Sequence, residues 1–447
     1  MTTYFKYTLA LVGLLIFTGC EDYYNLEEVN PNDSIDPAIA ITNLRSAQGA
    51  RAGIYSGLQA SNFDRYLAGS QYFSDEADWT GTFPTRAEFD IYNVITSNTT
   101  LATMFTSHYA TINDANAFLD VVPSVDDPSL NEAENIRTSL LAEARFARGI
   151  AFFELTQGWR DVPIVLTPTR SDAVGDALNV TRSPQSEVYA QAISDFTFAR
   201  DNLIDGASLG ATVAAANGYL ARIALYQGRW QDAISFATAA VGADYDLTGI
   251  EYLDDELFYI KFSKADGNSL AFFYAPSALG GRRSIAPSAK LVGSFEDGDL
   301  RAAATFASLS NGQLYGVKYD DFSSASGNQD DPLLLMRGAE MVLILAEANA
   351  RLGNFDEANA WFNQVRQRAG LADLTLDADN FEDLILQERF VELSLESGHR
   401  LWDLRRTDRA EEVLGPDGYE ACDAVWPLPQ RDIDRNPNLE QNNCCNC

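Results

Sequence analysis

The sequence predicts a mainly α-helical fold in which helix pairs form a scaffold, with a loop-rich inserted lobe and few short strands. The main observation is an internal repeat: residues 220–233 (LARIALYQGRWQDA) can be laid over residues 345–358 (LAEANARLGNFDEA). In both copies small residues line a helix, Gly228 or Gly353 ends it, and an aromatic residue opens a second helix. This pattern is typical of tetratricopeptide repeats, in which small side chains let paired helices approach closely.

Apolar residues at helical spacing predict further helices outside the repeat. In chain order, these helices are expected from residue 42 onward and over 101–120, 131–157, 184–203 and 379–404. The fourth has a start signal, because Ser183 and Pro184 precede Glu187. We therefore expect helix pairs over about 131–241 and 336–406.

Two longer stretches lack helical periodicity. Residues 61–100 are rich in aromatic residues, Asp and Thr, and are expected to be loops. Residues 245–335 separate the two copies of the repeat and are rich in Gly, Ser, Asp, Phe and Tyr. We interpret residues 245–335 as an inserted lobe that packs along one side of the helical scaffold.

The N-terminus reads as an export signal. Lys6 precedes the apolar stretch from Leu9 to Phe17, which is shorter than the roughly 20 residues that a membrane-spanning helix needs. Thr18 and Gly19 before Cys20 form the pattern of a bacterial lipobox, although Phe17 replaces the usual Leu. We expect residues 1–19 to be a removed lipoprotein signal peptide and Cys20 to be lipidated.

The lipobox also sets the predicted domain organisation. Residues 20–40 are acidic and rich in Asn, Pro and Asp, which predicts a tether between the lipid anchor and a single domain over residues 41–447. Such a protein is anchored to the membrane without spanning it. The alternative is an ordinary secretory signal with an incidental Cys20.

The remaining cysteines lie in a C-terminal tail over residues 420–447. They are Cys422, Cys444, Cys445 and Cys447. In an exported protein, this clustering predicts disulfide bonds within the tail. A zinc site of four thiolates is the alternative, but the adjacent Cys444 and Cys445 fit the usual ligand spacing poorly.

Composition excludes some classes of function. The 447 residues carry a formal net charge of −32, which would repel phosphate backbones and argues against nucleic-acid binding. His108 and His399 are the only histidines, so a His-based metal site or catalytic triad is not expected. We expect no cofactor. Calcium is the alternative, at Asp75-Glu76-Asp78 or in the loop from Asp244 to Asp255, although charge runs are usually solvated.

Four ordered segments carry a family resemblance. Residues 142–165 end in a Gly-x-x-Asp-Val-Pro turn, and residues 285–301 contain Phe-x-x-x-Asp-x-Arg. Residues 386–406 contain a Glu-Arg…Gly-His-Arg…Asp-Leu-Arg-Arg signature, and residues 425–442 contain Pro-x-Pro…Asn-Pro-Asn-Leu-x-Gln-Asn. With the lipobox, these segments make the chain similar to the SusD/RagB family of outer-membrane nutrient-binding lipoproteins. The Cys-rich tail is additional to the family pattern.

The resemblance implies a function. Members of the family are anchored by lipid to the outer face of the outer membrane, where they partner a SusC-like TonB-dependent transporter. They capture oligo- or polysaccharides and deliver them to it, and they are not enzymes. Three alternatives stay open: capture of peptides, as in RagB-like members, an envelope scaffold, and a glycosidase. The last would need two carboxylates at a set separation, and no catalytic motif stands out.

Sugar-binding residues can be proposed from chemistry. Sugar CH faces stack on aromatic rings, and hydroxyl groups need side chains such as Asp, Asn and Arg. Two loop-rich stretches, 62–83 and 272–319, combine both kinds of residue, and the resemblance implies that ligands bind in these two regions. Trp79 is the main candidate; packing against the helical body is the alternative. The candidate carbohydrate-binding residues are Asn62, Arg65, Asp75, Asp78, Trp79, Tyr274, Arg282 and Tyr315.

Overall fold

The computed structural model describes the chain from residue 37 to residue 447, apart from residues 67–70, 131–134, 170–178, 207–209 and 322–328. Cys20, the signal segment and most of the tether therefore lie outside the described residues. The described tether ends in the short helix α2 (Pro37–Ala40). No helix in the described ranges has the length and apolar character that a membrane-spanning segment requires.

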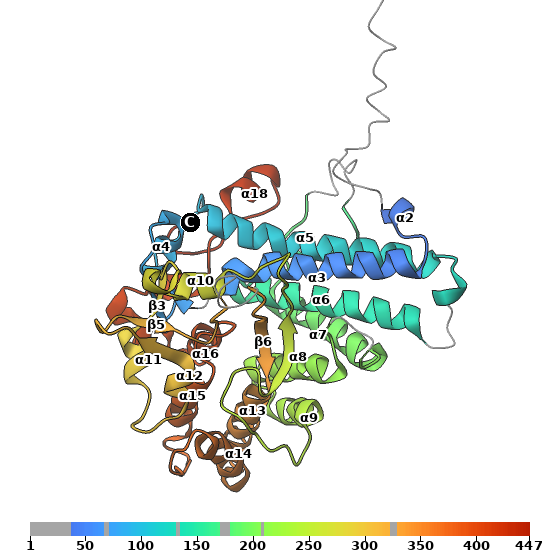
Figure 1. Ribbon diagram of the computed structural model, residues 1–447. Coiled ribbons are helices and arrows are strands. Elements are labelled where there is room, and N and C mark those ends of the chain that lie inside the picture. The colour runs from blue at the N-terminus through green and yellow to red at the C-terminus, as the bar shows by residue number, and fades with distance from the viewer. Residues whose placement is uncertain (1–36, 67–70, 131–134, 170–178, 207–209, 322–328) are drawn as a thin grey trace, which may run out of the picture.

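The body of the protein is a stack of helices, as the sequence predicts. Each helix of the stack packs on the next one along it, and Figure 1 shows the stack running from α3 and α5 down to α13 and α14. The stack consists of α3 (Leu44–Tyr66), α5 (Thr99–Val121), α6 (Ile136–Trp159), α7 (Gln185–Asn202), α8 (Val213–Tyr226), α9 (Trp230–Val241), α13 (Gly338–Arg351) and α14 (Phe355–Arg368).

The internal repeat forms the helix pairs α8–α9 and α13–α14. Gly228 and Gly353 end the first helix of each pair with φ of +67° and +79°, a left-handed conformation that glycine adopts without steric cost. Helix α9 packs directly on α13, although the inserted lobe separates them in sequence. Gly218 of α8 permits another close approach, since a Cβ there would overlap the sulfur of Met336, which lies between residues 333 and 337 at the end of the inserted lobe.

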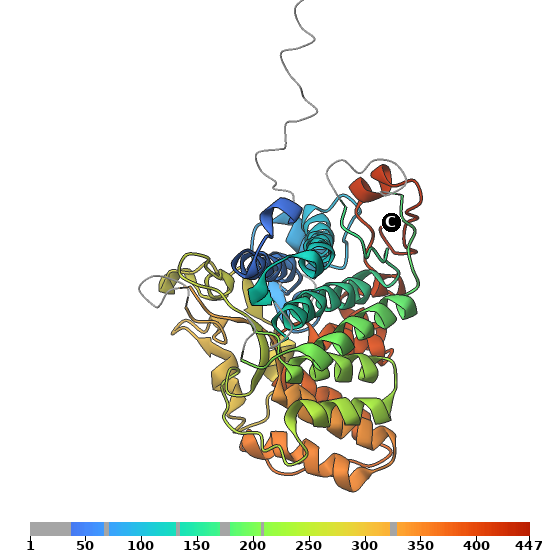
Figure 2. The ribbon, with the colours of Figure 1, turned by 90° about the vertical axis from the view of Figure 1, so that its right-hand side faces the viewer.

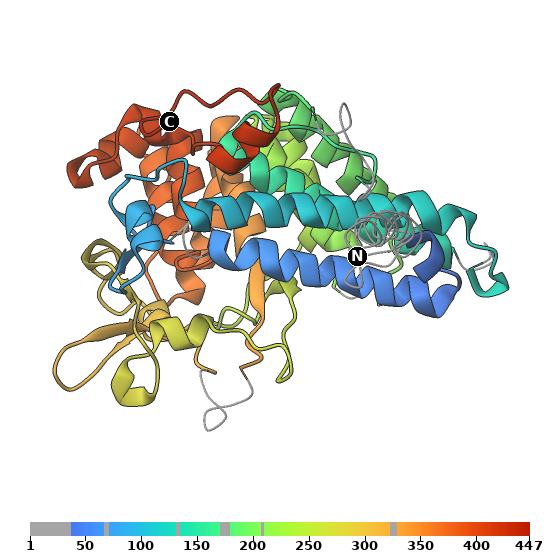
Figure 3. The ribbon, with the colours of Figure 1, turned by 90° about the horizontal axis from the view of Figure 1, so that it is seen from above.

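The inserted lobe begins and ends at one antiparallel ladder, in which β2 (Glu256–Ile260) pairs with β6 (Leu333–Arg337). Figures 2 and 3 show the lobe on one side of the helical stack, beside α3. Its other elements are short. They are α10 (Leu270–Tyr274), β3 (Ile285–Pro287), α11 (Ala289–Gly293), α12 (Arg301–Thr305), β4 (Phe306–Ser308) and β5 (Leu314–Gly316), the last two paired with each other.

Two expectations from the sequence differ from the structure. The stretch 61–100 is not all loop, because α3 continues to Tyr66 and the chain also forms β1 (Ala77–Trp79) and α4 (Pro84–Asp90). The helix expected over 379–404 is two helices, α15 (Phe381–Glu392) and α16 (His399–Arg406). Leu395 and Gly398 between them have φ of +59° and +80°, which no continuous helix can accommodate.

A buried network of charged side chains joins α14, α15 and the lobe. Its centre is Glu392 at the end of α15, which accepts hydrogen bonds from Arg301 of α12 (3.1 Å), Arg337 of β6 (2.9 Å) and Arg368 of α14. Arg337 also donates to Asp255, just before β2, at 3.0 Å. Burial would raise the pKa of Glu392, but the three guanidinium groups outweigh it and hold the pKa well below its ordinary value.

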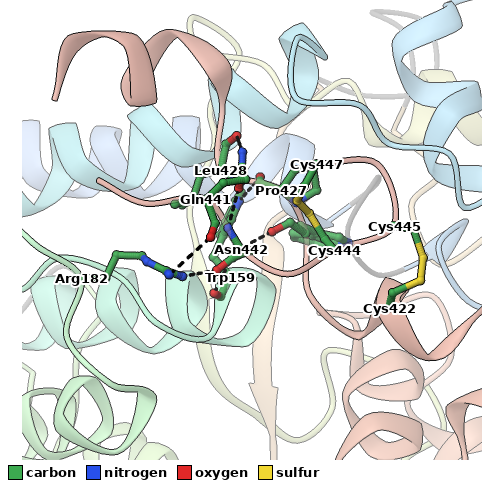
Figure 4. The surroundings of a disulfide bond; sticks show 11 residues. Trp159, Arg182, Cys422, Pro427, Leu428, Gln441, Asn442, Cys444, Cys445 and Cys447 are labelled. Atoms are coloured by element: carbon green, nitrogen blue, oxygen red, sulfur yellow. Dashed lines mark hydrogen bonds between the residues drawn. A yellow bond between two sulfur atoms is a disulfide. The ribbon is translucent and has the colours of Figure 1, made fainter. Parts of the chain in front are cut away.

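The C-terminal tail folds back onto the end of α6, as Figure 4 shows. It follows the short helix α17 (Ala410–Leu414) and includes the short helix α18 (Gln430–Arg435). Trp159 Nε1 donates to the carbonyl of Pro427 at 2.9 Å, and Asn442 Nδ2 donates to the carbonyl of Trp426 at 2.8 Å. Disulfides join Cys422 to Cys445 and Cys444 to Cys447, which closes the end of the tail onto its own beginning.

We predict that Glu392→Gln destabilises the protein by about 3–5 kcal/mol at neutral pH, because it leaves buried guanidinium groups without their charge partner. The folded-state pKa of Glu392 lies below its ordinary value of 4.5. Its contribution is therefore complete above that pH and is lost as pH falls through the folded-state pKa. Urea midpoints of the two proteins should converge as pH is lowered from 6 to 3. The control is Glu412→Gln, which removes an exposed partner of Arg409 and should cost less than about 1 kcal/mol.

Candidate functional site

The two stretches expected to bind ligand meet in a small antiparallel ladder. Strand β1 pairs with β3 so that Trp79 lies opposite Ile285. The pairing continues beyond the strands, where Thr80 donates its backbone N–H to the carbonyl of Ser284 at 2.8 Å and its hydroxyl to the carbonyl of Arg283 at 2.6 Å. Residues separated by about 200 positions in the sequence thus share one surface.

Three of the candidate binding residues are buried and hold the fold together, so we do not retain them as ligand contacts. Asn62 donates to the carbonyl of Leu58, one turn earlier in α3. Asp75 forms a bidentate ion pair with Arg400 of α16 at 2.7 and 2.9 Å. Tyr274 donates its hydroxyl to Gln71 and is 1% exposed. These buried residues of the two stretches therefore stabilise the fold beneath the surface and do not form part of it.

Trp79, the main candidate from the sequence, is also packed inside and only 8% exposed. Its ring lies 5.4 Å from that of Tyr72. Gly81 lies so close that a Cβ there would overlap the indole. The backbone N–H of Trp79 donates to Asp90 at 2.9 Å. Burial raises the pKa of Asp90 to about 6 despite this hydrogen bond. Trp79 is therefore a core residue of the β1–β3 ladder and not an exposed stacking platform.

The remaining candidates divide by position. Asp78 and Arg282 are exposed. For Asp78 the reason is the alternation of side chains along β1, which turns Asp78 outward where Trp79 turns inward. Tyr315 is half-buried in β5. The side chain of Arg65, in the last turn of α3, lies outside the described part of the structure.

The exposed aromatic ring at this surface belongs to Phe83, which is 43% exposed. The guanidinium carbon of Arg282 lies 4.5 Å from the centre of the Phe83 ring. The guanidinium carbon of Arg86 lies 5.1 Å from the Phe273 ring and 5.7 Å from the Trp79 ring. We call this surface the aromatic–arginine patch; it comprises Thr82, Phe83, Arg86, Phe273 and Arg282.

The sequence analysis missed Phe83, Arg86 and Phe273 as site residues, although all three lie in or beside the two stretches it selected. One local signal points to Phe83. Pro84 follows it and fits the first position of a helix, and Phe83 is indeed the N-cap of α4. Phe83 is a large apolar residue between a loop and the start of a helix, where few neighbouring side chains are available to cover it.

A groove of about 680 Å³ lies elsewhere in the described part of the structure. It lies between the start of α5 and helix α18, and its lining includes Thr99, Thr103, Gln430 and Arg435. Its described lining residues include no aromatic ring, so it lacks the stacking surface that sugar recognition favours. The two acidic clusters considered for calcium each have a carboxylate that is paired with arginine: Asp75 with Arg400, and Asp255 with Arg337.

The fold and the patch together define a class: a helix-pair scaffold that presents an exposed aromatic and cationic surface beside an inserted lobe. Residues 42–225 match the sequence model of a family described as "Starch-binding associating with outer membrane", and residues 309–423 match that of the SusD family. A SusD-like protein of Formosa agariphila is 26% identical, over 98% of this chain and 99% of its own.

Solved structures show the same fold. A SusD superfamily protein from Bacteroides vulgatus superposes with a TM-score of 0.77 at 20% identity, covering 89% of this chain and 98% of its own. A structure described as a laminarin-binding SusD-like protein has a TM-score of 0.77 at 21% identity, covering 90% of this chain and 99% of its own. The chain belongs to the SusD-like family.

We predict that Trp79→Ala destabilises the protein much more than Phe83→Ala does. Removing the buried indole leaves a cavity and should cost about 3 kcal/mol, whereas truncating the exposed Phe83 ring should change stability by less than about 1 kcal/mol. Thermal unfolding of both variants against the native sequence measures the difference. Equal melting temperatures for the two variants would contradict the burial of Trp79.

Proposed function

We propose that this protein is a cell-surface lipoprotein that captures oligo- or polysaccharide at the aromatic–arginine patch and delivers it to a SusC-like TonB-dependent outer-membrane transporter. The observation that carries the proposal is the exposed Phe83 ring, with Arg282 against it and Thr82 hydrogen-bonded to Arg282. An exposed ring can stack on the CH face of a sugar, while neighbouring polar groups bind its hydroxyls.

Family membership supports the same function. The family matched by residues 42–225 is described as starch-binding and associated with the outer membrane, and a structural neighbour binds laminarin. The residues that make up the aromatic–arginine patch include no carboxylate, whereas hydrolysis of a glycosidic bond ordinarily uses a pair. Capture without turnover is therefore the function that this patch supports.

The lipid anchor is proposed from the sequence Thr18-Gly19-Cys20 and the acidic residues Glu21 and Asp22 that follow it. Such an anchor would hold the binding domain at the outer face of the outer membrane, on the same surface as the transporter. Delivery requires this proximity, because a glycan captured by a freely diffusing protein would be carried away from the cell.

We predict that Phe83→Ala weakens glycan binding at least tenfold, because each 1.4 kcal/mol of lost stacking is a factor of ten. Affinity electrophoresis of residues 21–447 against neutral and acidic polysaccharides measures this, and the same gels detect turnover. The matched control is Leu352→Ala, since Leu352 is also 43% exposed but lies at the end of α13. Retention of a basic peptide mixture in place of any glycan would favour peptide capture, and retention of neither would favour an envelope scaffold.

We predict that Cys20→Ala abolishes lipid attachment. In cells of the source bacterium grown with labelled palmitate, the native chain should incorporate label and sediment with outer membranes, and the variant should do neither. Uptake of the captured glycan should fall in cells that carry only the variant. Unchanged labelling of Cys20→Ala would refute the anchor without bearing on the binding patch.

A further inference from the structure

We propose that the aromatic–arginine patch selects acidic glycans, whose sugars carry carboxylate or sulfate groups, through the guanidinium group that Arg282 holds against the Phe83 ring. This inference rests on the proposed function and adds the substrate class. Carboxylate and sulfate present the same chemistry to an arginine, namely two or more anionic oxygens that can accept parallel hydrogen bonds.

The charge of Arg282 is not neutralised by a neighbouring carboxylate. Its guanidinium donates to the Thr82 hydroxyl at 3.1 Å and lies against the Phe83 ring, and no ion pair joins it to a carboxylate among the residues that the structure describes. Other exposed arginines, such as Arg45 and Arg160, also lack an ion pair in the described structure, so what distinguishes Arg282 is its position against the Phe83 ring. The arginines of the buried network show the contrast, since Arg301 and Arg337 each bind more than one carboxylate.

The backbone holds Arg282 in a fixed place. Its N–H donates to the carbonyl of Phe272 at 2.8 Å, and the N–H of Arg283 donates to the carbonyl of Ala275 at 2.8 Å, so the loop folds back onto α10. Gly281 permits this fold, because a Cβ there would overlap the carbonyl oxygen of Ala275. A guanidinium presented by a pinned loop loses less conformational freedom on binding than one on a free chain.

The Phe83 ring positions the guanidinium group of Arg282. A guanidinium over an aromatic face keeps the N–H groups at its edge available, and these donors match the oxygens of a carboxylate or sulfate. The uncovered part of the Phe83 ring remains for the CH face of the same or the adjoining sugar. Arg86 lies at the other side of the patch, against Phe273 and Trp79.

The charges that oppose an anion at this surface are limited. The exposed carboxylate of β1, Asp78, interacts with Arg283, and no ion pair joins it to Arg282 in the described structure. The acidic body of the protein carries the net charge of −32. At physiological salt its field is screened beyond about 8 Å, so contacts within the patch dominate once a glycan has arrived.

Binding to matched polymers tests the inference. Isothermal titration calorimetry at 0.15 M salt would compare polygalacturonate with its carboxyl-reduced neutral form, and dextran sulfate with dextran. We expect the acidic member of at least one pair to bind at least tenfold more tightly than its neutral twin. The first pair reports carboxylate recognition and the second reports sulfate recognition.

Variants separate the patch from general charge effects. Arg282→Gln should reduce affinity for the acidic polymer about tenfold, the loss expected for one charge-assisted hydrogen-bonded contact. Arg282→Lys should recover only part of it, because an ammonium cannot form the bidentate contact. The matched control is Arg45→Gln, which removes the same charge from the exposed start of α3, at the opposite end of that helix from the patch, and should leave affinity within twofold.

Equal affinity for acidic and neutral twins, or equal losses for Arg282→Gln and Arg45→Gln, would overturn the inference. Binding of neutral glucans such as laminarin in a Phe83-dependent manner, with the acidic polymers ignored, would overturn it while the proposed function stands. Absence of binding to every glycan would overturn both.

Discussion

The buried charge network around Glu392 is the constraint on which the geometry of this protein depends. Burying charged groups costs several kcal/mol each unless nearly every donor and acceptor is matched. The three arginines that meet at Glu392 come from a stack helix, from the inserted lobe and from the strand that closes the lobe. These contacts tie the lobe to the helical stack, and α10, with the loop that carries Arg282, belongs to the lobe held in this way.

The segments that identify the family contribute buried ion pairs that hold the fold together, and they do not form the exposed patch. In the signature over residues 386–406, Asp403 accepts from Arg389 at 2.6 Å and from Arg406 at 2.8 Å, and Arg406 continues to Glu347 of α13. Arg400 binds Asp75, which immediately precedes the β1 region. Such residues are recognisable because their roles in the fold allow few substitutes. For the same reason, these residues identify the scaffold that the chain forms but do not identify a ligand.

The sequence predicted the helix pairs well because their signals are local. Small residues at helical spacing and the glycines that end α8 and α13 act within one turn of the chain. The binding surface was predicted only as two stretches, because exposure depends on distant partners. Trp79 and Asp78 are neighbours in sequence, yet pairing of β1 with β3 buries one and exposes the other. Nothing in residues 62–83 alone shows where residues 285–287 will lie, so Trp79 seemed a better candidate than Phe83.

The separation of framework from surface explains how one fold can serve different ligands. Phe83 and Arg282 take no part in the buried network, and their neighbours in the loop are held by backbone hydrogen bonds that do not depend on side-chain identity. Substitution at these exposed positions therefore alters ligand chemistry at small cost to stability. At Arg282 the loop holds a guanidinium against the exposed Phe83 ring without an ion pair to a carboxylate of the described structure, and the acidic glycan proposed above would supply that anion.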